Sequence, residues 1–348
     1  MYEQSRLNDN AGNGARGLRA IPSEELLHIV RNSYGFPHLK IIKDLGGSSC
    51  LNLLAIHNSD RFVIRVYRPY VNAARLADIN LVRHTLHMQG IPVSEVELTQ
   101  SGHSWVVFEH RLVEVERYVE SDEHMNSWKY LMKGLPLLGR IHSILQNIEC
   151  SPDGKTPRFA NYIDPENVMN MTWKGINRIR RWNQSSENTK LADAAELLAQ
   201  SVITTDIPLL PKQIVHGDYW DNNVFFKDGR IVLVNDFDYM GERARIDDLA
   251  LILYFYDCSA EPITDKRLDK LRRLVDAYDE GLNNHLSKTE RAALPIAMAR
   301  QPLWSIGGWI ALLDDEEAAQ RHAANMLDEV QWALNIIKDL NRWVNAFK

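Results

Sequence analysis

One stretch of the sequence, residues 214–238, constrains the fold more than any other. A tight polar loop lies there between two apolar runs, and a further apolar run ends in two acids. Lys227-Asp-Gly-Arg230 separates the last two runs, and Asp-Gly in such a position is a strong signal for a β-hairpin. The hairpin would bring Asn223, just before its first strand, and Asp236, just after its second, to the same end.

Three polar side chains of this stretch have the order of a phosphoryl-transfer site. Asp218 can orient the attacking hydroxyl of a substrate or accept its proton. Asn223 offers a neutral oxygen and Asp236 an anionic one, and magnesium prefers such hard oxygen ligands. Metal ions held there would neutralise charge on the transferring group. The alternative is a polar surface loop without chemistry, which the joint presence of the three residues disfavours.

Other residues of the same stretch would shape the site or line it. Gly217 permits a sharp bend, and His216 can brace nearby backbone. Asp221 and Asp238 are further acids near the same mouth, and Trp220 could stack on a ligand. We treat Asp221, Asp238 and Trp220 as candidates for binding the acceptor, although both acids could instead face water.

Length and composition favour an ordinary globular protein with two domains or lobes. The chain has 348 residues, of which 45% are hydrophobic. Its net charge of −6 does not indicate a basic surface that would bind nucleic acid. Its three cysteines are far apart, which favours reduced thiols in the cytoplasm over disulfides. Since neither a signal pattern nor a membrane-length apolar run is visible, we expect a soluble cytoplasmic protein with no membrane partner. The oligomeric state stays open.

The first part of the chain predicts a flexible tail and then a β-rich lobe. Residues 1–20 lack periodicity and form the expected tail. Residues 21–119 form the expected N-terminal, nucleotide-binding lobe. Its predicted elements are a helix to about residue 33, a β-meander over 39–66, a helix over 72–88 and two strands over 104–108 and 112–119.

This lobe contains six candidate nucleotide-binding residues: Gly47, Ser48, Ser49, Arg65, Arg117 and Val119. The glycine turn could lay backbone amides over phosphates and lacks the Lys-Ser/Thr ending of a P-loop, although an ordinary hairpin turn is the alternative. Strand alternation takes Arg65 off the apolar face, where it could pair with phosphates or simply face solvent. Backbone groups at Arg117 and Val119 could bond an adenine edge.

Residues 120–348 predict a larger, mostly helical lobe that carries the catalytic stretch and binds the acceptor. Apolar residues recur at helical spacing between Leu131 and Leu145, and His142 beside them is more typical of a packed residue than of a ligand. We expect two long helices at the end, over 292–313 and 316–347, with the acids of 314–317 at a solvated helix start.

The central stretch resembles a known family. His216-Gly-Asp-Tyr-Trp-Asp-Asn-Asn223 is similar to the His-Gly-Asp-x4-Asn signature of the aminoglycoside phosphotransferase-like family, which includes antibiotic kinases, choline kinases and type II homoserine kinases. Asn235-Asp-Phe-Asp238 and Arg245-Ile-Asp-Asp-Leu-Ala250 resemble the metal-binding and following helical segments of that family. Phe62–Arg68 resembles its small-lobe strand, and Gly139–His142 the helix after its hinge.

The resemblance implies a protein-kinase-like α+β fold, with a small β-rich N-terminal lobe and a larger helical C-terminal lobe. It implies ATP or GTP as the donor, magnesium as the metal, Asp218 as the catalytic acid, and Asn223 and Asp236 as metal ligands. His216 and Asp248 would support that site from behind. Arg65 departs from the pattern, because the family often has lysine there.

The favoured function is therefore a small-molecule kinase that transfers a γ-phosphoryl group to a hydroxyl of an antibiotic-like, in some cases cationic, acceptor. A metabolite kinase of the homoserine or choline type is the nearest alternative. Two other classes stay open at this point: a metal-dependent phosphoesterase, and a nucleotide-binding regulator that does no chemistry.

Overall fold

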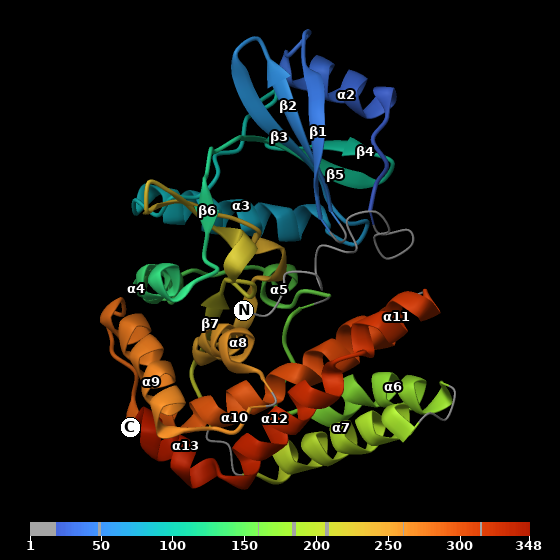
Figure 1. Cartoon of the computed structure of the whole chain (residues 1–348). Coiled ribbons are helices and arrows are strands. Elements are labelled where there is room, and N and C mark those ends of the chain that lie inside the picture. Colours follow the sequence, from blue (N-terminus) through green and yellow to red (C-terminus); the bar gives the residue numbers. More distant parts are fainter. Residues whose placement is uncertain are drawn as a thin grey trace. The chain divides into compact units, whose positions relative to one another are not determined.

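The chain forms two compact units, one ending at Ser121 and the other beginning at Asp122. The computed structural model, drawn in Figure 1, describes residues 19–47, 50–158, 160–182, 186–205, 209–259, 261–313 and 315–348. The first unit is built on a sheet and the second is mainly helical, so the predicted α+β class is confirmed. Most of the predicted tail lies outside the described residues.

In its described residues, the first unit is an antiparallel sheet with two helices. Its strands pair in the order β1-β2-β3-β5-β4. The helices are α2 (Glu24–Tyr34) and α3 (Ala73–Met88), and the strands are β1 (Lys40–Gly46), β2 (Leu51–His57), β3 (Asp60–Val66), β4 (Val106–Phe108) and β5 (Arg111–Arg117). All these elements were predicted, but the last strand ends two residues earlier than expected.

Helix α2 covers the apolar face of this sheet. Ser23 caps the helix by accepting a hydrogen bond from the Leu26 amide, and Gly35 ends it with a φ of +70°. Strand alternation sends Phe62, Ile64 and Val66 of β3 into the core that α2 completes. This burial of one face is what fixes the register of β3.

Helix α3 packs on the opposite, polar face through buried charges. Glu114 of β5 is fully buried and accepts hydrogen bonds from Tyr67 Oη (2.7 Å), Asn80 Nδ2 (2.6 Å) and Arg83 Nη1 (3.2 Å). Arg83 of α3 also pairs with Glu116 at 3.3 Å. A buried acid is stable only with such partners, so these contacts fix α3 against the sheet.

The second unit combines a helical bundle with short strands. Its helices are α4 (Trp128–Leu145), α5 (Pro152–Lys155), α6 (Val168–Arg181), α7 (Ser186–Thr204), α8 (Ile246–Asp257), α9 (Asp265–Glu280), α10 (Lys288–Trp304), α11 (Glu316–Ala323), α12 (Met326–Lys338) and α13 (Leu340–Phe347). Its strands are β6 (Glu123–His124), β7 (Lys212–Val215), β8 (Val224–Lys227), β9 (Arg230–Val234) and β10 (Gly241–Ala244). The π-helical segment η3 (Ser305–Ile310) continues α10.

Helix α10 is the central element of this bundle. It packs against α7, α8, α12 and α13, and its residues from Ala293 to Trp304 are buried. Its extension η3 lies against α6, where the two backbones approach closely at glycines. A Cβ atom at Gly175 would lie 2.0 Å from the Ile306 carbonyl oxygen, and one at Gly307 would lie 2.4 Å from that of Met171.

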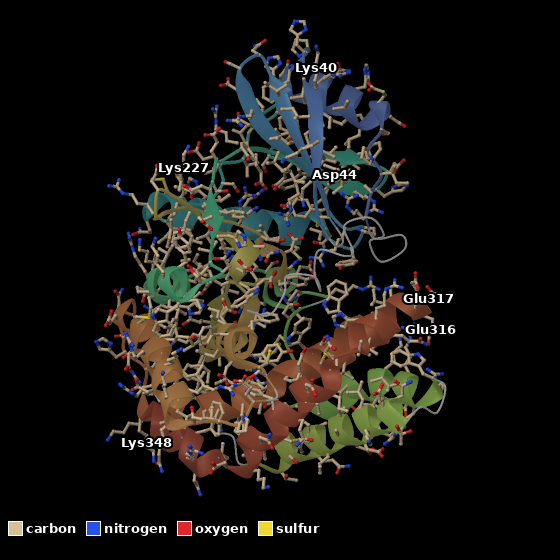
Figure 2. All side chains as sticks on the ribbon, viewed as in Figure 1. Lys40, Asp44, Lys227, Glu316, Glu317 and Lys348 are labelled. Atoms are coloured by element: carbon tan, nitrogen blue, oxygen red, sulfur yellow. The ribbon has the colours of Figure 1, made fainter. Side chains whose placement is uncertain are left out.

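The predicted single helix over 316–347 is wrong, because the segment forms α11, α12 and α13. The breaks fall at Asn325 (φ −118°, ψ 6°) and Asp339 (φ −115°, ψ 35°), whose short polar side chains favour helix boundaries over helix interiors. Asp315 caps α11 by accepting from the Ala318 amide, so the acids there do mark a helix start, at Glu316 and Glu317 (Figure 2). Asp314 lies outside the described residues.

No helix in the described part of the chain combines the length and the apolar character that crossing a membrane requires.

Neighbouring glycines of η3 give a matched test of this packing. Gly307→Ala should lower the free energy of unfolding by about 1–3 kcal/mol, because the added methyl group meets α6 backbone. Gly308→Ala is the control: among the described residues, no atom from another element lies within 4 Å of its Cβ position, so it should be neutral or slightly stabilising. Differential scanning calorimetry compares the two, and equal melting temperatures would contradict the close approach of α6 and η3.

Candidate functional site

The hairpin predicted in the central stretch is present as β8 and β9. Asp228 (φ +51°) and Gly229 (φ +70°) form its turn, and two consecutive positive φ values are typical of the tight type I′ turn. Val224 pairs with Val234, and the Asn235 amide donates to the Asn223 carbonyl oxygen at 2.9 Å. The residues before β8 and after β9 therefore lie side by side at one end.

The polar loop of residues 216–223, hereafter the Asp218 loop, is fixed from below by His216 and Gly217. His216 is fully buried, with its Nε2 at 3.0 Å from the Asn235 carbonyl oxygen and its Nδ1 accepting from the Asp218 amide at 3.2 Å. Gly217 has a φ of +84°, and a Cβ atom there would lie 2.0 Å from the Tyr239 carbonyl oxygen. Only glycine fits this position without strain.

Asp248, near the start of α8, anchors the same loop. Both of its carboxylate oxygens accept from the Gly217 amide, at 3.0 and 3.1 Å, and its Oδ2 lies 3.2 Å from His142 Nε2. Burial raises the pKa of Asp248, but the hydrogen bond and charge of His142 outweigh it and hold the pKa below its ordinary value. Asp248 therefore stays an anion beneath the loop.

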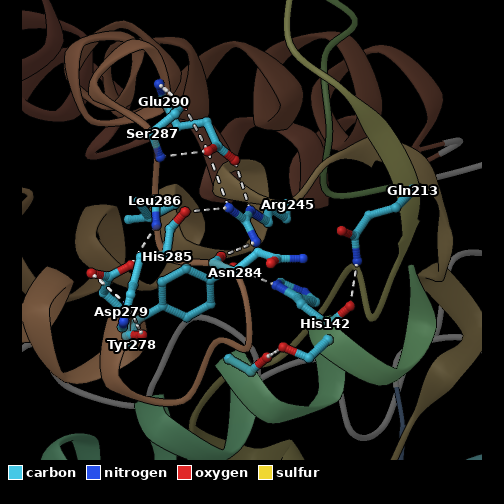
Figure 3. A network of polar contacts seen from close by, with 12 residues as sticks. His142, Gln213, Arg245, Tyr278, Asp279, Asn284, His285, Leu286, Ser287 and Glu290 are labelled. Atoms are coloured by element: carbon cyan, nitrogen blue, oxygen red, sulfur yellow. Dashed lines mark hydrogen bonds and ion pairs between the residues drawn. The ribbon is translucent and has the colours of Figure 1, made fainter. Parts of the chain in front are cut away.

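Figure 3 shows how His142 is held in turn. Its Nδ1 lies 2.7 Å from Tyr278 Oη, and its carbonyl oxygen accepts from Gln213 Nε2 at 2.8 Å. Beside it, Arg245 forms a bidentate pair with Glu290, which belongs to the capping box that starts α10. His142 is thus a packed residue, as predicted, and it links α4, α8 and α9.

Asp218 is half-buried and held by two amide side chains. Its Oδ1 accepts from Asn161 Nδ2 at 2.6 Å, and its Oδ2 accepts from Asn223 Nδ2 at 2.9 Å. Burial and the neighbouring Asp236 carboxylate raise the pKa of Asp218 well above its ordinary value of 3.8, against the lowering effect of both amides. An oriented carboxylate with a raised pKa is suited to accept a proton near neutral pH.

Asn223 and Asp236 could hold a divalent cation. Asn223 Nδ2 donates to both the backbone and side-chain oxygens of Asp218, so its Oδ1 is turned toward other ligands. Asp236 has a φ of +62°, a left-handed conformation that aspartate tolerates better than most residues. One amide oxygen and one carboxylate leave room for phosphate oxygens and water, which is how proteins usually bind Mg²⁺.

The three candidates for acceptor binding lie at different depths around this loop. Asp221 pairs with His124 Nδ1 of β6, and Asp238 is buried, with its amide directed to Asp236 Oδ1 at 3.4 Å. Trp220 is partly exposed and lies over Phe255 of α8, with ring centroids 4.8 Å apart. Trp220 is therefore the candidate with ring surface available to a ligand.

The nucleotide-binding candidates belong to the first unit. Arg65 is 4% exposed, so a solvent-facing strand residue is excluded, and its guanidinium lies 5.1 Å from the Tyr67 ring centroid. The Arg117 amide donates to the Glu95 carbonyl oxygen at 3.0 Å. Gly47 (φ +123°) is part of the turn between β1 and β2, whereas Ser48 and Ser49 lie outside the described residues.

Sequence reasoning missed Asn161, His124 and the ribbon formed by β7 and β10. Asn161 contacts Asp218 from a loop that is 57 positions earlier, and no motif or periodicity marks it. His124 belongs to β6, a strand of two residues that pairs with β8. Strand β7 precedes the hairpin in the sequence, strand β10 follows it, and the two strands pair with each other. A sequence signal for pairing between such separated segments would have been needed to predict this ribbon.

Comparison with known proteins decides the family. Residues 40–290, most of the chain, match the family model described as the phosphotransferase enzyme family (APH). The chain belongs to this family. Its members transfer phosphate to hydroxyl groups of small molecules, so the chain is a small-molecule phosphotransferase. The family predicted from the sequence motifs is therefore confirmed.

Individual relatives of this phosphotransferase are more distant. A homoserine kinase from Phenylobacterium zucineum (strain HLK1) is 34% identical over 87 residues, which are 25% of this chain and 26% of that protein. The match thus spans about a quarter of the curated relative.

Solved structures confirm the protein-kinase-like fold of this family. A microcompartment-associated aminopropanol kinase has a TM-score of 0.69 at 17% identity and covers 91% of this chain and 98% of its own. An amicoumacin kinase in complex with AMP-PNP, Ca²⁺ and Ami has a TM-score of 0.62 at 16% identity and covers 89% of this chain and 94% of its own.

The burial of His216 predicts a dependence of stability on pH. Burial lowers the pKa of His216 from 6.5 to about 4. Between these values the unfolded chain binds a proton that the folded chain does not, so stability is full above pH 6.5 and falls as the pH drops toward 4. The loss amounts to roughly 3 kcal/mol at about 1.36 kcal/mol per unit.

Urea unfolding between pH 4 and 7.5, in buffer containing EDTA, measures this loss. His216→Gln keeps a side-chain amide that can donate toward Asn235 and should flatten the pH dependence. His285→Gln, at an exposed histidine, is the control and should keep the wild-type slope. A His216→Gln variant with the wild-type slope would show that His216 is not the group that titrates.

Proposed function

We propose that this phosphotransferase moves the γ-phosphoryl group of ATP, with magnesium, to a hydroxyl of an amine-bearing small molecule. The observation that carries the proposal is the hydrogen bond between Asn223 and Asp218, formed beside Asp236 at the end of the hairpin. It joins a candidate proton acceptor to a candidate metal ligand, and these are the two functions that transfer to an alcohol requires.

In this proposal Asp218 orients the acceptor hydroxyl and takes its proton. Asn161 and Asn223 each donate to one carboxylate oxygen, which fixes the plane of the carboxylate and leaves a lone pair on each oxygen for the hydroxyl. His216 and Asp248 act through the backbone, because they hold the amides of Asp218 and Gly217. The Asp218 loop is thus set before the substrate binds, which saves reorganisation during the reaction.

Asn223 Oδ1 and Asp236 would hold the magnesium ion. When bound, the ion neutralises charge on the donor phosphates and on the transferring group. Asp236 lies two residues after β9 with a left-handed backbone, and its carboxylate is close enough to Asp218 to raise the pKa of that residue. The amicoumacin kinase structure contains a nucleotide analogue, AMP-PNP, and a divalent cation, Ca²⁺. Its ligands support the use of a nucleotide and a divalent cation in this family.

The first unit would bind the nucleotide. Arg65 is the candidate for the phosphates, and a buried arginine offers several N–H donors to them. Gly47, Ser48 and Ser49 are the candidate phosphate-binding turn. Two residues after β5, the described residues give the backbone of Val119 no hydrogen-bond partner, so Val119 is a candidate for the adenine edge. The Arg117 amide already donates to Glu95, so Arg117 is a candidate only through its carbonyl oxygen.

Two acceptor classes share the proposed chemistry. Antibiotic-like acceptors are supported by the likeness to the amicoumacin kinase and to a spectinomycin phosphotransferase. Small amino alcohols are the second candidate, since the aminopropanol kinase has a higher TM-score than either and the curated relative is a homoserine kinase. Trp220, Asp221 and Asp238 are the candidates for contacting the acceptor.

Asp218→Asn tests the proton acceptor. It keeps the size of the side chain but removes the charge, so kcat should fall about 10²–10⁴-fold while the affinity for AMP-PNP stays nearly unchanged. The control is Asp228→Asn in the exposed hairpin turn, which should keep wild-type kcat because asparagine also tolerates a positive φ. Calorimetric nucleotide titration and initial rates provide both measurements, and wild-type turnover in Asp218→Asn removes Asp218 from its role.

An acceptor screen for ATP consumption separates the two acceptor classes and the other functions. Aminoglycosides, spectinomycin, amicoumacin, 1-amino-2-propanol, homoserine and choline are compared at equal concentration, with and without Mg²⁺. We expect Mg²⁺-dependent phosphorylation of an amine-bearing alcohol and none of the same alcohol lacking the amine. Phosphate release from phosphoesters without ATP would instead indicate a phosphoesterase, and ATP binding without turnover on any acceptor a regulator.

A further inference from the structure

A pocket of about 530 Å³ lies within the second unit, outside the Asp218 loop. It includes Lys212 and Ala244, which pair at one end of the β7–β10 ribbon, whereas Val215 leads into the loop from the other end. The intervening strand spans about 10 Å at 3.4 Å per residue. The wall residue Tyr162 follows Asn161, which donates to Asp218, so the pocket adjoins the site, although none of residues 216–223 lines it.

Apolar side chains form most of the wall. They come from α7, from the loop before β7, from the start of α8 and from α10: Val202, Ile203, Leu210, Ile246, Ala293 and Ala297. The volume is within the range of pockets that bind small molecules, which are usually apolar with a few placed polar groups. The class of ligand is then decided by the polar groups that remain.

Arg300 is the most informative of these polar groups. It is 3% exposed, and it pairs through Nη2 with Asp247, which is also buried. That is the one hydrogen bond of Arg300 within the described part of the chain, although a guanidinium has five N–H donors. None of its nitrogens is among the fully buried atoms that lack a partner, so the unused N–H groups can be reached from the pocket and can donate to an acceptor on a ligand.

Tyr162 supplies a second donor beside it. Two guanidinium groups lie near its ring, that of Arg243 at 4.7 Å and that of Arg300 at 5.6 Å from the ring centroid. Its hydroxyl forms no hydrogen bond with any residue that the structure describes. Burial and the Asp247 carboxylate raise the pKa of Tyr162, so the hydroxyl keeps its proton and can only gain by donating it to an acceptor.

The charged side chains of the pocket wall balance one another, so the groups with unused donors decide which ligand fits. Lys212 and Arg300 are cationic, and Asp247 and Glu166 are anionic. Arg243 is not part of the wall, but its guanidinium lies 4.7 Å from the Tyr162 ring. A planar carboxylate matches the geometry of an arginine better than a neutral group does. We propose that this pocket binds a small amphipathic monocarboxylate, with its carboxylate on Arg300 and Tyr162 and its apolar body between α7 and α10.

The test measures binding and so does not depend on the proposed function. Sodium 3-phenylpropionate and sodium hexanoate are titrated into the full-length protein by isothermal calorimetry, with 3-phenylpropanol as the neutral counterpart. We expect saturable binding of at least one carboxylate below 10 mM and at least ten-fold weaker binding of the alcohol. No saturable binding of either carboxylate up to 10 mM would overturn the proposal.

Two variants locate the bound carboxylate. Ala297→Leu fills the apolar part of the pocket and should weaken binding at least ten-fold, whereas Tyr162→Phe removes one donor and should weaken it several-fold. Tyr256→Phe is the control, at a partly buried tyrosine of α8 that contacts Trp128 and lies outside the pocket wall. Wild-type affinity in both Tyr162→Phe and a folded Ala297→Leu, verified by its melting temperature, would place the ligand elsewhere and overturn the assignment.

Discussion

The geometry of the site depends on one buried carboxylate, Asp248. It is an anion in a place where water cannot solvate it, so it must be satisfied by protein donors. The Gly217 amide and His142 supply them, and both are brought to it by segments that are distant along the chain. Removing either partner would leave a buried charge uncompensated, which costs several kcal/mol. The position of Asp218, one residue after Gly217, follows from this requirement.

The sequence predicts the part of the site that is built from local contacts. Asp-Gly sets the turn of the hairpin, and the turn sets the register that brings Asn223 beside Asn235. The elements of the sheet were predictable for the same reason: one apolar face demands alternation, and alternation is visible in the residues of β3. N-cap residues such as Ser23 predict where a helix begins, because their hydrogen bonds span only three residues.

The sequence does not predict contacts between polar residues that are far apart along the chain. Asn161 and Asp218 are 57 positions apart, and Arg83 and Glu114 are 31 apart. A single polar residue that meets another leaves no periodic trace, and its partner is chosen by the fold that results. The prediction of a single helix over 316–347 is wrong for a related reason. Its apolar spacing continues through Asn325 and Asp339, but the backbone leaves the helical conformation at both residues.

Asp247 and Asp248 show how one helix start can serve two environments. Successive residues of an α-helix point about 100° apart, so adjacent acids in the first turn of α8 face different neighbours. Asp248 is directed to Gly217 and His142, while Asp247 pairs with Arg300 at the wall of the pocket. Arg243 lies between these environments, because it donates to the Tyr239 carbonyl oxygen below Gly217 and faces the Tyr162 ring. Charge in the pocket and the conformation of the Asp218 loop therefore share a single layer of buried side chains, and a change on one side alters the electrostatic field on the other.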